Sequence, residues 1–205
     1  EHFFEGTVEG YNLWSKTHAD LIIKQDLISL ENVRDIDGLE VLVELLSERV
    51  GSTVSYNSLA EDIGRNDKTI KRWLDILERL YIVFRVSSYS KNIIRGLSKS
   101  GKYYFYDLAR VQGDEAQKLE NLVALALKKE IEFLEDCRGI PGKLHFLQTK
   151  DKKELDFLVL QKGHSSSLFE VKMGDDSVSK NFSLFQAFFP HANKIQLVRH
   201  LSREY

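Results

Sequence analysis

The spacing of apolar side chains in the second half of the chain predicts two helices and four strands. A helical spacing of leucines begins after Asp114 and continues to about Glu135. Shorter apolar runs follow, and a second helical run ends before Pro190. The predicted strands are 144–148, 155–160, 168–173 and 194–198, and the shorter helix is 180–189. This α-β-β-β-α-β order predicts an α/β sandwich.

The first half of the chain has helical patterns up to about residue 80. Residues 1 to about 30 give a moderately amphipathic pattern, and a second pattern runs from Leu39 to Val50 until Gly51 stops it. Asp37 is the predicted N-cap of this second helix, because Glu40 follows it at the spacing of a capping box.

A short helix, a tight turn and a second helix come next. Ser55 is a suitable cap for the first of them and Gly64 closes it, while Asn66 is a suitable cap for the second. Strand-like runs then occupy 82–86 and 102–106. Two helices around a tight turn, followed by a two-stranded ribbon, are the plan of a winged helix-turn-helix.

The predicted fold class is therefore mixed, α+β with an α/β part, in two domains. Residues 1–107 are expected to form a helical linker and a winged helix-turn-helix. Residues 108–205 are expected to form the α-β-β-β-α-β domain.

Basic side chains gather at two places in the predicted winged helix. Three face outward early in the second helix, and others lie between the two ribbon strands, in a segment from Arg85 to Lys102 that has no acidic residue. The predicted DNA-binding residues are Lys68, Lys71, Arg72, Lys91, Arg95 and Lys99. The alternative is a winged helix that spaces protein partners, with a solvated basic loop.

Composition narrows the class of protein without fixing its function. The chain has 205 residues, of which 42% are hydrophobic and 29% are charged, and its net charge of −2 argues against wholesale coating of nucleic acid. A single cysteine permits no internal disulfide, and no apolar run approaches the roughly 20 residues that span a bilayer. A cytoplasmic protein is expected, with no membrane contact. The oligomeric state stays open, with a homo-oligomer among the alternatives.

The strongest chemical signal is a predicted hairpin that carries three charged side chains. A turn centred on residues 163–164 places Asp156 opposite Glu170, and residues two apart in a strand share a face, so Lys172 projects with them. The same alternation puts Leu155 with Phe157, on the face opposite to these charges. Charges on an otherwise apolar sheet are costly unless a ligand, a metal or mutual pairing compensates them.

Two carboxylates and a lysine at this spacing suit phosphodiester hydrolysis. Asp156 and Glu170 offer hard oxygen ligands for Mg²⁺ or Mn²⁺, and Lys172 is placed to steady a water molecule bound to the metal. Glu120, polar within an apolar helical stripe, is the candidate further ligand. Glu154 is a candidate assistant, although a solvated strand start explains it too. The alternative for the whole group is an ion-pair cluster between Lys172 and the carboxylates.

These residues resemble the PD-(D/E)XK nuclease superfamily. The resemblance rests on Glu120 in the helix, Asp156 in a strand and Glu170-Val171-Lys172 in the next strand, in the right order of elements. It implies a restriction-endonuclease-like fold and Mg²⁺-dependent cleavage of DNA, with Asp156, Glu170, Lys172 and Glu120 as catalytic residues and the three acids as metal ligands.

More of the chain resembles the C-terminal half of a prokaryotic family of AAA-type ATPases. The matching segments are 55–89, 102–107, 119–123 and 154–157. In that family a P-loop ATPase precedes a winged helix and a nuclease-like domain of unassigned function. This chain contains no G-x-x-x-x-G-K-[ST] sequence, so no ATP site is expected in it. Because the chain begins at Glu1 and its single methionine is Met173, a longer parent protein is expected, and the resemblance implies that its ATPase lies upstream.

Two functions remain open from the sequence. The first is a DNA-associated module with a metal-dependent deoxyribonuclease site. The second is a catalytically inactive nuclease-like fold that binds DNA or a protein and regulates the ATPase.

Overall fold

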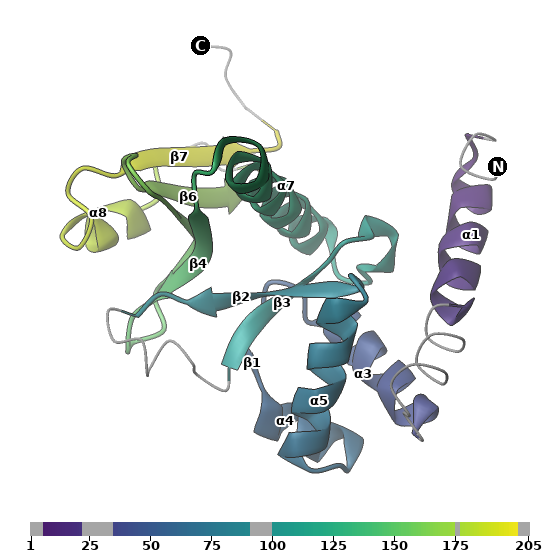
Figure 1. Cartoon of the computed structure of the whole chain (residues 1–205). Coiled ribbons are helices and arrows are strands. Elements are labelled where there is room, and N and C mark those ends of the chain that lie inside the picture. The colour runs from purple at the N-terminus through teal and green to yellow at the C-terminus, as the bar shows by residue number, and fades with distance from the viewer. Residues whose placement is uncertain (1–5, 22–34, 91–99, 175–176, 201–205) are drawn as a thin grey trace.

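A computed structural model describes residues 6–21, 35–90, 100–174 and 177–200. The described chain is a mixed α and β protein whose centre is a seven-stranded sheet (Figure 1). Within the described ranges, no helix is long and apolar enough to span a bilayer.

The elements of the first half follow one another in the predicted order. Their bounds are α1 Val8–Leu21, α3 Ile36–Glu48, β1 Val54–Ser55, α4 Tyr56–Ile63, α5 Asp67–Arg79, β2 Val83–Ser88 and β3 Ser100–Phe105. A short 3-10 helix, Leu108–Arg110, leads into the second half.

The second half also has the predicted succession of helices and strands. Its bounds are α7 Glu115–Arg138, β4 Gly142–Gln148, β5 Glu154–Gln161, β6 Ser167–Lys172, α8 Asn181–Gln186 and β7 Asn193–Val198. Helix α8 ends at Gln186, before the predicted end at residue 189. Phe182 and Phe185 of the helix pack against the sheet, and the chain after the helix continues as hydrogen-bonded turns.

Local capping signals decide most helix starts. The side chains of Ser55 and Asn66 accept the hydrogen bonds that begin α4 and α5, and Gly64 ends α4 at a φ of 71°, in the left-handed region where glycine is favoured. The prediction for α3 is wrong, because its cap is Asp35 and not Asp37. Asp35 accepts a hydrogen bond from Gly38 N at 3.0 Å and also pairs with Arg65 at 2.6 Å, a contact distant in sequence.

One sheet runs through both halves of the chain, with strand order β1-β3-β2-β4-β5-β6-β7. Strands β1, β3 and β2 pair antiparallel, and so do β4, β5 and β6. The two groups meet where β2 pairs parallel with β4, at Ser87 with His145 and Ser88 with Phe146. This pairing explains why β2 extends two residues beyond its predicted end.

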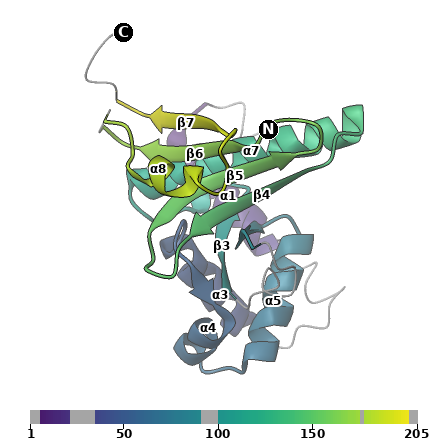
Figure 2. The same cartoon turned by 90° about the vertical axis from the view of Figure 1, so that its left-hand side faces the viewer.

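Helices α7 and α8 lie on opposite faces of the strands of the second half (Figures 1 and 2). The larger apolar cluster includes side chains from α3, α5, β2 and β3 together with Val123 of α7 and Phe157 of β5. A smaller cluster fills the space between the sheet and α8. Since the larger cluster draws on both halves, they share one core.

A buried amide also ties the two halves together. The Asn121 side chain of α7 donates to Phe105 O and accepts from Phe105 N, both at 2.8 Å, so it pairs with β3 as a neighbouring strand would. Asn121 has no exposed surface. Both of its hydrogen-bonding groups are thus satisfied, which a buried amide requires.

The β2–β4 junction predicts a pH dependence of stability through His145. Its Nδ1 lies 3.2 Å from Ser87 Oγ and 3.3 Å from Ser87 O, and burial lowers the pKa of this histidine. As pH falls through about 6.5, this histidine becomes protonated in the unfolded chain but stays neutral in the folded chain, so the free energy of unfolding falls.

His145→Gln has no group at this position that titrates. We therefore expect the stability advantage of the wild type over this variant to be larger at pH 7.5 than at pH 5, measured by urea denaturation. An equal advantage at both pH values contradicts the prediction.

Candidate functional site

The hairpin of β5 and β6 has the register that the sequence predicts. Phe157 pairs with Phe169, and Leu158 with Leu168, so the next pair along the hairpin is Asp156 with Glu170. Asp156 Oδ2 accepts a hydrogen bond from the backbone N–H of Val171 at 2.8 Å. The turn therefore brings the two predicted acids side by side.

The alternation of β5 is broken at Asp156, and this differs from the prediction. Between His145–Leu158 and Leu147–Leu155 the register shifts, so β5 has one more residue than β4. Leu155 consequently packs with Leu158 under α8, whereas Phe157 packs in the other cluster. Such bulges re-aim neighbouring side chains. Asp156 lies at this irregularity, so strict alternation does not set its direction.

The loop and the helix that follow β6 donate hydrogen bonds to the side chain of Glu170. Its Oε1 accepts hydrogen bonds from Ser179 Oγ at 2.9 Å and from Asn181 Nδ2 at 3.4 Å. Its Oε2 is buried and has no hydrogen-bond partner among the described residues. A buried carboxylate oxygen without a donor is costly, and such atoms are rare in folded proteins.

Lys102 lies in the middle of this acidic group, although it comes from β3 in the other half of the chain. Its side chain is 1% exposed, and its Nζ is 3.1 Å from Glu120 Oε1 and 2.5 Å from Glu154 Oε1. Tyr104, two residues on in the same strand, donates its hydroxyl to Glu120 Oε1 at 2.7 Å. Two side chains of β3 therefore hold the carboxylate of Glu120.

We refer to Lys102, Glu120, Glu154, Asp156, Glu170 and Lys172 as the carboxylate centre. Four carboxyl groups face two ammonium groups in it, so the acids are in excess. Burial raises the pKa of Asp156 to about 7, with Glu120 and Glu170 adding to the effect and the Val171 N–H and Lys102 opposing it. Burial likewise raises the pKa of Glu170. Burial alone would lower the pKa of Lys102, but Glu120 and Glu154 raise it.

The metal site that the nuclease resemblance implies would have Asp156, Glu170 and Glu120 as its ligands. Among the residues that the structure describes, no group of three or more His, Cys, Asp or Glu side chains is arranged to hold a metal ion. Glu120, the expected further ligand, is engaged by Lys102 and Tyr104 instead. Asp156 and Glu170 remain as a pair of carboxylates. Burial raises the pKa of Glu170, and the hydrogen bonds from Ser179 and Asn181, together with Lys172 of β6, oppose part of that rise.

Sequence reasoning missed Lys102 as a member of this centre and assigned it to the basic loop. Lys102 is buried, so it is unavailable to DNA. Arg85, at the other end of that segment, is partly buried and donates to Ser100 O at 2.7 Å. A signal was present in the sequence: a lysine directly before Tyr103-Tyr104-Phe105 is a charge in an aromatic strand, and such a charge needs a buried partner.

The predicted DNA-binding residues on α5 are accessible. Lys68, Lys71 and Arg72 are all exposed, while the opposite side of the helix is buried through Ile70, Trp73, Leu74 and Leu77. The other three predicted residues, Lys91, Arg95 and Lys99, lie outside the described residues.

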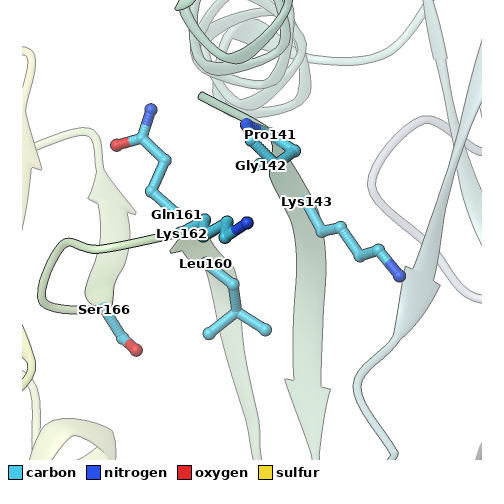
Figure 3. Close-up of a pocket in the computed structure, with 7 residues that line it drawn as sticks. All are labelled: Pro141, Gly142, Lys143, Leu160, Gln161, Lys162 and Ser166. Atoms are coloured by element: carbon cyan, nitrogen blue, oxygen red, sulfur yellow. The ribbon is translucent and has the colours of Figure 1, made fainter. Parts of the chain in front are cut away.

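An open pocket of about 350 Å³ lies at the far end of the β4–β5 ladder from Asp156 (Figure 3). It is lined by Pro141, Gly142, Lys143, Leu160, Gln161, Lys162 and Ser166. No residue of the carboxylate centre lines it. This pocket is therefore separate from the predicted chemistry.

Comparison with known proteins gives a family for the chain but no activity. The family model described as "Domain of unknown function (DUF8612)" matches residues 5–112, more than half of the chain, and the chain belongs to this family. The model "Domain of unknown function (DUF4143)" matches residues 116–204, and domains of this second kind are typically found with AAA-type ATPases.

A similar curated protein is an uncharacterized protein from Haemophilus influenzae, 27% identical over 157 residues. The match covers 68% of this chain and 35% of the relative, so the chain spans about a third of that protein's length. No solved structure matches the chain significantly.

The excess of acids predicts that removing one of them stabilises the fold. Asp156→Asn keeps an oxygen for the Val171 N–H and removes a buried charge beside Glu120 and Glu170. We expect the free energy of unfolding at pH 8 to rise by about 1–3 kcal/mol, as is common where function and stability conflict. Urea denaturation measures it. Asp151→Asn, in the exposed turn before β5, is the matched control and should change little. A destabilised Asp156→Asn variant contradicts the prediction.

Proposed function

We propose that this member of the DUF8612 family is a DNA-associated module of an AAA-type ATPase. Two observations support the ATPase connection. The second half matches a domain that typically accompanies such ATPases, and the chain spans only about a third of its longer relative. The ATPase itself is proposed to lie in the remainder of the parent protein, since this sequence has no P-loop motif.

The first half supports the DNA-binding part of the proposal as a winged helix. Helices α4 and α5 flank a tight turn, and β2 and β3 follow them as an antiparallel ribbon. The short β1, directly before α4, pairs with β3 at the edge of this ribbon. The second half is proposed to be a restriction-endonuclease-like unit on the strength of its element order and of Asp156, Glu170 and Lys172.

The observation that carries DNA association is the exposed basic side of α5. Lys68, Lys71 and Arg72 occupy its first two turns, and its apolar side is fully buried, so these cations are presented on a rigid support. Phosphate contacts from such side chains dominate the affinity of proteins for DNA. Asp67 and the exposed Asp75 lie one turn before and one turn after Lys71, so three cations share this side of α5 with two acids.

The proposal predicts salt-dependent DNA binding through α5. Replacing Lys68 and Lys71 by alanine should weaken binding to duplex DNA and lower the slope of log affinity against log salt by about 2, because each phosphate contact contributes about 0.9. Fluorescence anisotropy over a salt series measures both. The matched control replaces Lys129 and Lys162, two exposed lysines of the second half, by alanine. If both double variants behave like the wild type, α5 is not the DNA-binding element.

A second candidate function is metal-dependent cleavage of DNA at the carboxylate centre. It is favoured by one observation, the buried Glu170 Oε2 that lacks a donor, next to Asp156 and Lys172. Against it stands the engagement of Glu120 by Lys102.

This second candidate predicts cleavage in the presence of Mg²⁺ or Mn²⁺ that Glu170→Gln abolishes. The same substitution should leave DNA binding by α5 unchanged, which separates the two functions. Single-stranded, duplex and branched DNA are incubated with the purified chain and each metal, and products are resolved on gels. If none of the three is cut, the cleavage proposal fails.

A further inference from the structure

The carboxylate centre already contains a cation, and that cation is part of the chain. Lys102 Nζ contacts one oxygen each of Glu120 and Glu154, at 3.1 and 2.5 Å. It also lies 5.4 Å from the centroid of the Phe146 ring, a favourable position for an ammonium group. A buried lysine is costly without such partners, so this arrangement is built and specific.

The lysine and the metal would compete for the same oxygens. A Mg²⁺ or Mn²⁺ ion bound by Glu120 would need to approach its oxygens to about 2.1 Å. Glu120 Oε1 instead accepts from both Lys102 and Tyr104. An ammonium group at the same carboxylate repels a divalent cation, and the side chain of Lys102 is 1% exposed, so solvent does little to screen this repulsion.

Lys102 and solvent reach the carboxylates of Glu120 and Glu154 from opposite sides. Lys102 reaches the carboxylates from the interior of the protein, whereas the side chains of Glu120 and Glu154 keep 19% and 26% of their surface exposed. The acids are thus open to solvent on one side and neutralised from the other. The neutralising residue belongs to the half that matches one family, and the acids belong to the half that matches another.

We propose that Lys102 is a built-in counter-ion which takes the place of a divalent metal ion at the carboxylate centre and suppresses metal binding there. The inference concerns the same centre as the cleavage candidate but needs no part of the DNA-association proposal. It accounts for the absence of a three-ligand metal group among the described residues, because the acid that would complete one is already paired.

The test is a titration of the purified full chain with Mn²⁺. Binding is measured by calorimetry and, independently, by the loss of the electron paramagnetic resonance signal of free Mn²⁺. The wild type should give no saturable site below millimolar Mn²⁺. Lys102→Met should gain one saturable site with an affinity at least about tenfold higher, since one repelling charge has been removed. Its melting temperature should rise with Mn²⁺, because a ligand of the folded state stabilises it.

Two controls separate the loss of charge from a disturbed fold. Lys102→Arg keeps the cation and should behave as the wild type does. Lys68→Met makes the same substitution at an exposed position of α5 and should gain no site. Adding Glu120→Gln to Lys102→Met should remove the gained site, which would identify Glu120 as a ligand. Lys102→Gln removes the charge but keeps a polar group for Glu120 and Glu154, so it should gain the same site and tests the idea even if Lys102→Met folds poorly.

The outcomes distinguish the proposals. A wild-type chain that binds Mn²⁺ tightly, with binding lost in Glu170→Gln, overturns the counter-ion proposal and strengthens the cleavage candidate. A folded Lys102→Met variant that gains no site overturns the counter-ion proposal as well. DNA binding through α5 is tested independently, by the fluorescence anisotropy measurements, and its outcome does not depend on these results.

Discussion

A buried lysine among carboxylates is the constraint on which the centre of this protein depends. Lys102 is 1% exposed, and burying an ammonium group costs much free energy unless a carboxylate lies beside it. Glu120 on α7 and Glu154 on β5 meet it, and both belong to the other half of the chain. The ion pairs therefore favour one arrangement of α7, β3 and β5, because Lys102 would be a buried charge without a carboxylate partner if both pairs were lost.

The rest of the junction between the halves is consistent with this requirement. Strand β2 pairs with β4, Asn121 pairs with the backbone of Phe105, and the larger apolar cluster includes side chains from both halves. The boundary between the two matched families falls near residue 114, at the N-cap of α7. Two units that sequence families separate are thus joined through a common sheet, a common core and a common charged centre. The exposed basic side of α5 and the carboxylate centre consequently lie on elements that share one sheet and one core.

The carboxylate centre resembles a nuclease site in its residues more than in its geometry. Its acids lie close together, and burial with repulsion from Glu120 and Glu170 raises the pKa of Asp156 to about 7. Clusters of carboxyl groups with perturbed pKa values are typical of functional sites, although structural ion-pair networks produce them too. What distinguishes the two cases here is the cation. The cation at Glu120 and Glu154 is the ammonium group of Lys102. The fold fixes this group in place, whereas a metal ion could exchange with solvent.

The sequence by itself determined whatever depends on near neighbours along the chain. The caps Ser55 and Asn66, the end of α4 at Gly64, the order of the elements and the register that sets Asp156 beside Glu170 all follow from local hydrogen bonding and from the length of one turn. The tertiary structure alone decided the rest. Asp35 caps α3 partly because Arg65 holds it, and the extra residue in β5 exists only relative to β4. Lys102 changed from a loop cation into a buried counter-ion because its partners, Glu120 and Glu154, are 18 and 52 residues away. Local pattern carries no information about partners at that distance, so only the folded chain reveals which charges meet.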